Sequence, residues 1–151
     1  MNGPPELLVD NSGDLYLFDA APFISDDEAV TFSGKSRSTQ STSAYVWSNG
    51  RVQAVFGTDG SYGFLESPAR NRRGTVVAYG SLGGIDRGIY MGGPGANAPV
   101  IQVGDTLAGS SVEALSFYRG LNERDQIAFW FRLQDGRSGV ARANLPSGTP
   151  P

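Results

Sequence analysis

Oxygen-bearing side chains gather near the start of the chain, in the run Asp10-Asn11-Ser12-Gly13-Asp14. Carboxylate, amide and hydroxyl oxygens at this spacing are ligands that Ca²⁺ accepts in proteins. The run lacks the closing bidentate Glu of an EF-hand loop, and the same residue types are typical of a tight turn. We therefore expect a turn without a bound metal.

Two short segments resemble parts of nucleotide-binding loops. Residues 34–36 read Gly-Lys-Ser, the ending of a phosphate-binding loop, but that loop needs a further glycine at the position of Ala29. Residues 93–98 have the glycine spacing of a dinucleotide site, yet Pro99 and a strand-like apolar run follow in place of the required helix. We expect no nucleotide and no other cofactor.

The composition removes several classes of function. The chain of 151 residues has no His and no Cys, so it lacks imidazole bases, thiol nucleophiles and the usual zinc ligands. Nothing in the sequence brings two of its 15 acidic residues together as the carboxylate pair of a glycosidase. With 12 basic residues and a net charge of −3, it has no basic stripe for nucleic acid, and no apolar run long enough to span a membrane. We expect that the protein is not an enzyme.

One strand pattern returns along the chain at intervals of about 50 residues. Residues 77–79 read Val-Ala-Tyr, residues 127–129 read Ile-Ala-Phe, and residues 30–32 read Val-Thr-Phe. A period of this length indicates one supersecondary unit that is copied along the chain. We expect the last residues of the three copies at equivalent buried positions: Phe32, Tyr79 and Phe129.

Glycine and proline separate short runs of aromatic and β-branched residues, which is typical of an all-β protein. The sequence predicts a single domain over 1–151 with three related antiparallel units of about three to four short strands, propeller-like or sandwich-like, the third incomplete. Asn49-Gly50 is its strongest hairpin signal, and a short helix competes only over 111–118. The predicted parts are an N-terminal hairpin (6–18), repeat 1 (22–60), repeat 2 (68–105), a partial repeat 3 (121–145) and a Pro-rich tail (146–151).

Residues 71–79 read Asn-Arg-Arg-Gly-Thr-Val-Val-Ala-Tyr and match the pattern Asn-x-x-Gly-x-x-x-Ala-Phe, with Tyr for Phe. Residues 121–129 resemble a shorter variant in which Asp125 takes the place of Gly, and the first copy has Ser25 and Glu28 where Asn and Gly are expected. Most of the chain thus resembles the NxxGxxxAF tandem-repeat family of bacterial secreted and surface proteins. The resemblance implies repeats like propeller blades and transfers no catalytic residue.

The predicted hairpin at the start and the incomplete third unit complement each other, because proteins rarely leave a sheet edge bare. We expect a non-enzymatic structural protein that assembles head to tail, possibly into fibres, by strand addition between copies of itself. The start of the chain shows no signal-peptide pattern, and the expected location is secreted or on the cell surface. The expected contact residues are Leu7, Leu8 and Val9 in the inserted strand, and Val140, Ala141, Arg142 and Ala143 at the receiving edge.

A carbohydrate-binding, propeller-like module that closes as a small oligomer is the alternative. Exposed aromatic rings would stack on the sugars of glycans or cell-surface polysaccharide, whereas packing between sheets would place the same rings in the core. The sequence leaves both roles open. The aromatic residues concerned are Tyr45, Trp47, Tyr62, Tyr90 and Trp130.

Overall fold

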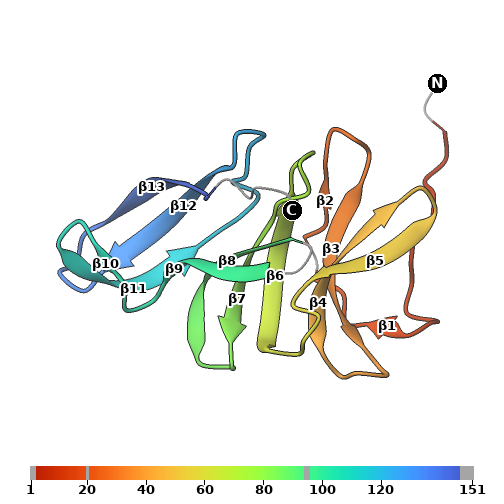
Figure 1. Cartoon of the computed structure of the whole chain (residues 1–151), viewed down its shortest axis with the longest axis horizontal. Helices are drawn as coiled ribbons and strands as arrows, with labels where there is room; N and C mark the ends of the chain where they lie inside the picture. The colour runs from red at the N-terminus through yellow and green to blue at the C-terminus, as the bar shows by residue number, and fades with distance from the viewer. Residues whose placement is uncertain (1–2, 20, 94–95, 147–151) are drawn as a thin grey trace.

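The structure is a computed structural model that describes residues 3–19, 21–93 and 96–146. These residues form three antiparallel β-sheets and no helix. The sheets follow one another along the long axis of the molecule, with the first sheet at one end and the third at the other (Figure 1). The predicted all-β class with three antiparallel units is therefore confirmed.

The first sheet is built around the hairpin that the sequence predicts. Asn49 and Gly50 have positive φ angles of 51° and 75°, as a two-residue hairpin turn requires. The strands β3, β4 and β5 follow in order, and β1 and β2 pair with opposite ends of the remaining edge of β3. The strands are β1 (Leu15–Tyr16), β2 (Phe23–Ile24), β3 (Val30–Ser36), β4 (Thr42–Ser48) and β5 (Arg51–Phe56).

The second sheet begins with a strand, β6, that the sequence does not predict. Two register shifts interrupt its pairing with β7, one between Tyr62 and Phe64 and one between Glu66 and Ala69. The second shift spans Pro68, which cannot donate to a neighbouring strand. These bulges interrupt the alternation of apolar and polar residues by which a strand is recognised in a sequence. In order across the sheet, the strands are β6 (Tyr62–Arg70), β7 (Val76–Leu82), β8 (Asp86–Gly93) and β9 (Ala96–Gln102).

The third sheet contains the segment where the sequence leaves helix and strand in competition. This segment forms strand β11, and a register shift between Val112 and Ala114 explains the ambiguity. The bulge puts Val112 and Leu115 on the same buried side at a spacing of three, which imitates a helix. In order across the sheet, the strands are β10 (Thr106–Leu107), β11 (Ser110–Ser116), β12 (Gln126–Leu133) and β13 (Ser138–Asn144).

The same tight turn precedes the repeated strand in each of the three sheets. The backbone amides of Ser25, Asn71 and Asn122 each donate to the carbonyl oxygen four residues later, at 3.0, 3.1 and 3.0 Å. The residue three positions after each donor has a positive φ angle, which explains the glycine of the motif Asn-x-x-Gly. Those angles are 63° at Glu28, 85° at Gly74 and 54° at Asp125.

The turns of the second and third units are joined by buried hydrogen bonds. The Asn71 side-chain amide donates to the carboxylate of Asp125 at 2.7 Å and to the carbonyl oxygen of Asn122 at 3.2 Å. Thr75 and Arg73 also donate to Asp125, each at 3.0 Å. Burial by itself raises the pKa of Asp125, but these hydrogen bonds and the Arg73 charge outweigh it and hold the pKa below its usual value. The aspartate in place of glycine therefore links two units.

The first and second sheets pack through small residues and aromatic rings. Ala78 and Tyr90 of the second sheet lie in one buried cluster with Ala44 and Phe56 of the first. A Cβ atom at Gly92 would lie 2.1 Å from the ring of Phe56. Glycine is therefore required there for the two sheets to approach.

The second and third sheets pack through larger side chains. Val77 and Ile89 share a buried cluster with Ile127, Phe129 and Leu133. Because Val77 and Ile127 hold the same place in their copies of the repeat, the two sheets meet through equivalent faces. This is the arrangement of a sandwich, whereas successive blades of a propeller meet through opposite faces.

The three repeated aromatic residues differ in their surroundings. Phe32 and Phe129 are each 5% exposed, as expected, but Tyr79 is only half-buried, so the expectation of three equally buried positions is wrong for Tyr79. Phe32 lies on the side of the first sheet where Phe18 covers it, with ring centroids 5.8 Å apart. Ala128 of the third sheet is exposed, because no further sheet covers that face among the described residues.

We predict that Asn71→Ala lowers the free energy of unfolding by about 3 kcal/mol, because several buried partners lose their hydrogen bonds together. The matched variant Asn122→Ala removes the same turn contacts at an exposed site and should cost about 1 kcal/mol. Denaturant unfolding of both variants measures the difference. Equal losses would show that the link to Asp125 contributes nothing.

We also predict that two neighbouring residues on opposite faces of β12 differ sharply in importance. Phe129→Ala empties a packed position and should cost about 3–5 kcal/mol. Trp130→Ala, on the uncovered face, should cost about 1 kcal/mol or less. Thermal or urea unfolding followed by circular dichroism tests this, and a large loss at Trp130 would contradict the assignment of the faces.

Candidate functional site

The outer edge of β13 lacks a neighbour that the other two units have. In those units the strand after the repeated one is followed by a further strand, β5 beside β4 and β9 beside β8. Among the described residues, no strand pairs with β13 on the side away from β12. The backbone groups along this edge are therefore free to accept another strand.

The hydrogen bonds at the two ends of β13 show which of its backbone groups point outward. Leu145 donates its N–H to the carbonyl of Asp125, and Leu133 donates to the carbonyl of Arg137. In an antiparallel pair, hydrogen-bonded residues alternate with residues whose groups point away from the partner strand. Odd-numbered residues of β13 therefore bond to β12, and Val140 and Arg142 direct their backbone groups to the open edge.

The predicted receiving residues divide between the two faces of the sheet. Val140 is 77% exposed and lies opposite Trp130, which is 39% exposed. Arg142 lies opposite Ala128 on the same uncovered face. Ala141 and Ala143 pack against the core cluster that the second and third sheets share. An added strand would thus continue a sheet with one face already packed.

The predicted N-terminal hairpin is wrong in its first half. Residues 7–9 form no strand, and Leu7 is 75% exposed while Leu8 and Val9 are half-buried. The returning strand exists as β1, but it pairs with β3. The loop after β3 stabilises the turn that precedes β1, because the Arg37 side chain donates to the carbonyl oxygens of Asn11 and Gly13.

The carboxylates considered for calcium are engaged by donors of the protein itself. Asp10 accepts from the amide of Ser12, and Asp14 accepts from the hydroxyl of Ser36 and the amide of Ser38. These hydrogen bonds lower the pKa of both carboxyl groups. In the ranges that the structure describes, no three acidic residues gather as a metal site.

Three of the five aromatic residues proposed for sugar binding lie in the core. Tyr62 and Tyr90 are buried between the first two sheets, with ring centroids 5.2 Å apart, and desolvation raises the pKa of Tyr62 to about 12. Tyr45 is buried and stacks on Phe32. Their proposed stacking on a ligand is therefore wrong, because their rings are packed in the core. Trp47 is half-buried, and Trp130 alone of the five is exposed.

The segments that resemble nucleotide-binding loops belong to strands. Gly34 and Lys35 lie within β3, where Lys35 pairs with both Tyr16 and Thr42. Residues 93 and 96–98 belong to the hairpin of β8 and β9, and residues 94–95 lie outside the described residues. In its described residues, neither segment offers the free backbone amides at a helix start that would bind a phosphate.

The structure also contains a cleft lined by Arg51, Arg70 and Arg73, which the sequence analysis does not predict. These residues come from two different sheets, so no spacing along the chain reveals them. The only local signal is their position beside the turns at Asn49-Gly50 and Asn71.

Comparisons with protein-family models, with curated protein sequences and with solved structures find no match to this chain. In the described part of the chain, no helix is long and apolar enough to cross a membrane. The resemblance to the NxxGxxxAF repeats stays a prediction that rests on the residues of the chain, among them Asn71 and Gly74.

Proposed function

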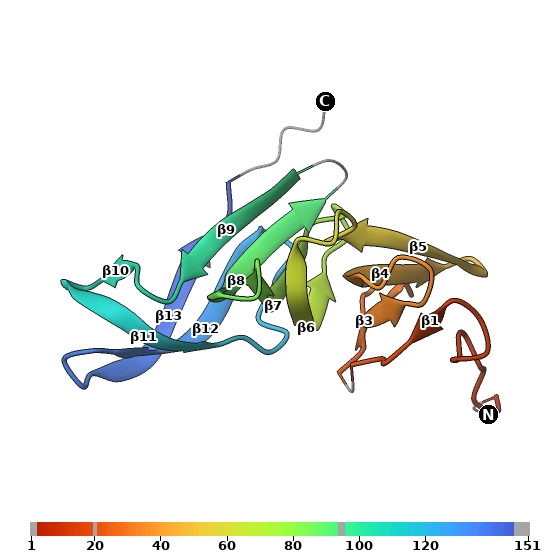
Figure 2. The same ribbon diagram turned by 90° about the horizontal axis from the view of Figure 1, so that it is seen from below.

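We propose that the protein is a non-enzymatic structural protein whose copies join head to tail by strand addition. In this assembly Leu7, Leu8 and Val9 of one copy pair with the outer edge of β13 of the next copy. One observation carries the proposal. The segment of residues 3–10 and strand β13 lie at opposite ends of the elongated molecule (Figures 1 and 2), and neither has a backbone partner on the side concerned among the described residues.

The separation of the two ends bears on the kind of assembly that we propose. Because the segment at one end lies far from the edge at the other end of its own molecule (Figure 1), we propose that the pairing involves another copy. A contact between two different surfaces repeats from copy to copy and builds an open array unless the rotation closes it. The geometry thus supports a linear array or filament.

The chemistry of the two surfaces suits strand addition. Main-chain hydrogen bonds to the outward groups of Val140 and Arg142 would each contribute about 0.5–1.5 kcal/mol. Alternate side chains of the inserted segment would bury apolar surface, since Leu7 is the most exposed residue of that segment. Pro4 and Pro5 precede the segment and hold the approaching chain extended.

The resemblance to secreted and surface repeat proteins supports a location outside the cell, which we include in the proposal. The carbohydrate-binding alternative has less support, because it needs exposed aromatic rings, and Tyr45, Tyr62 and Tyr90 are buried.

We predict that the intact chain forms oligomers whose size grows with concentration, and that Val140→Pro yields folded monomers. Proline removes an outward N–H and leaves the hydrogen bonds between β12 and β13 intact. The matched control Val140→Thr keeps that N–H and a β-branched side chain and should still assemble. Light scattering after size exclusion, with negative-stain images, measures the states, and circular dichroism reports folding.

Deletion of residues 1–10 provides the second arm of this test. The shortened chain should also be a folded monomer, and mixing it with intact protein should shorten the filaments by capping one end. Monomeric intact protein at high concentration, or assembly that survives both changes, would overturn the proposal.

A further inference from the structure

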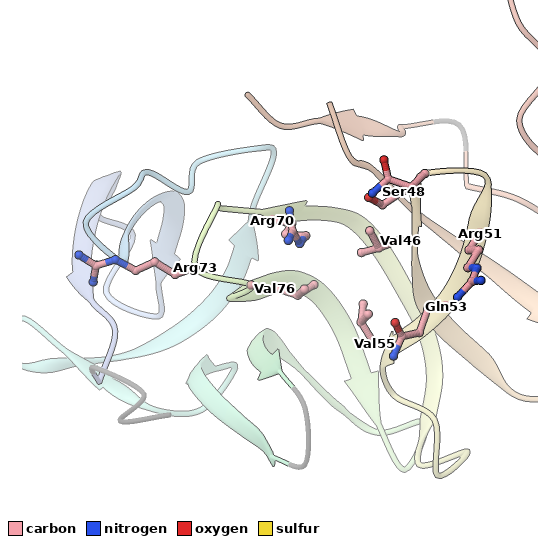
Figure 3. Close-up of a pocket in the computed structure, with 10 residues that line it drawn as sticks. Val46, Ser48, Arg51, Gln53, Val55, Arg70, Arg73 and Val76 are labelled. Atoms are coloured by element: carbon pink, nitrogen blue, oxygen red, sulfur yellow. The ribbon is translucent and has the colours of Figure 1, made fainter. Parts of the chain in front are cut away.

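A cleft opens between the β4–β5 hairpin of the first sheet and the β6–β7 turn of the second (Figure 3). Its volume is about 610 Å³, within the range of small-molecule sites. The cleft is formed by the first two sheets, since the third sheet contributes no lining residue. The lining residues are Val46, Ser48, Asn49, Arg51, Gln53, Val55, Arg70, Arg73, Gly74 and Val76.

The lining combines an apolar patch with hydrogen-bond donors. Val46, Val55 and Val76 project from three strands into the middle of the cleft (Figure 3). Ser48 and Gln53 stand beside them and can donate to oxygen atoms. No carboxylate lines the cleft. A ligand that fits would therefore present an apolar body together with hydrogen-bond acceptors.

The three arginines differ in how their charges are compensated. Arg70 pairs with Asp27 at 2.8 Å, and the hydrogen bond from Arg70, with a further one from Ser25, lowers the pKa of Asp27 to about 2. Arg73 pairs with Asp125 at 3.0 Å, and Figure 3 shows its side chain extending away from the cleft. Both carboxylates are ionised at neutral pH and offset these two charges.

Arg51 is the cation that remains uncompensated in the cleft. Its side chain has no ion pair and no hydrogen bond to another side chain or carbonyl among the described residues. Arg51 stands on the β5 side of the cleft and Arg70 on the β6 side, with the valines between them (Figure 3). An anion placed beside Arg51 would meet a planar group with several donors and no competing acid.

We propose that this cleft binds a small organic carboxylate, with the carboxylate at Arg51 and the apolar body over Val55 and the edge of Val46. The planar fork of arginine matches the two oxygens of a carboxylate. Val55 is half-buried, whereas Val46 is 8% exposed and Val76 is 1% exposed, so an aromatic or aliphatic body would lose contact with water mainly on Val55 and on the edge of Val46. This binding site is independent of the proposed assembly.

Titration of the folded chain with phenylacetate tests the proposal by NMR. We expect saturable shifts of the methyl groups of the three valines and of the Arg51 side-chain N–H. Phenylacetamide, which has the same shape without the charge, should bind at least about tenfold more weakly. Inorganic phosphate and glucuronate, which lack the apolar body, should also bind more weakly.

Variants separate the role of Arg51 from a general effect of charge. Arg51→Gln should weaken phenylacetate binding by about tenfold, equivalent to about 1.4 kcal/mol, while Arg87→Gln on an exposed part of β8 should leave it unchanged. Asp27→Asn should strengthen binding, because it releases Arg70. The chain without residues 1–10 should bind as the intact chain does, so failure of assembly and failure of binding can be distinguished.

Several outcomes would overturn the proposal. Shifts that never saturate, or that fall outside the cleft, would refute the site. Equal binding of phenylacetamide, or unchanged binding by Arg51→Gln, would refute the role of the charge. Equal or tighter binding of phosphate or glucuronate would refute the role of the valines.

Discussion

The structure depends on the second sheet, because both of its faces are buried. One face places Ala78 and Tyr90 against the first sheet, and the other places Val77 and Ile89 against the third. A sheet covered on both sides supplies two cores to a chain of 151 residues, and each outer sheet needs only one packed face. The first and third sheets form the two ends of the molecule (Figure 1). Both surfaces of the proposed assembly lie there.

The strands that carry the repeated pattern are predictable because their alternation is regular. In β12, Ile127, Phe129 and Leu133 all face the core, and the period of two is plain in the sequence. The strands β6 and β11 escape prediction because bulges interrupt the period, as at Val112. Tyr90 illustrates a different limit. The local sequence does not distinguish an aromatic residue in a strand that is covered on both faces from one that faces water.

The candidate site is predictable in outline and not in detail. The open edge follows from counting strands in the copies, and the apolar run at Leu7 is visible in the sequence. The direction of each backbone group in β13 depends on the register with β12, which the Asp135-Gly136 turn sets in the folded chain. The cleft with Arg51 and Arg70 could not be foreseen, because it exists only where two sheets meet.

The link between Asn71 and Asp125 has a consequence for how such a chain folds. Units of similar strand order can take one another's places during folding, which is a common route to misassembly in repeat proteins. Here the two junctions differ in chemistry. Exposed arginine–aspartate pairs bridge the first and second units at Asp26 and Asp27, and salt screens pairs of this kind. The second unit is joined to the third by a network around the buried Asp125 carboxylate, which salt screens less than the exposed pairs, so the contacts that suit one junction do not suit the other.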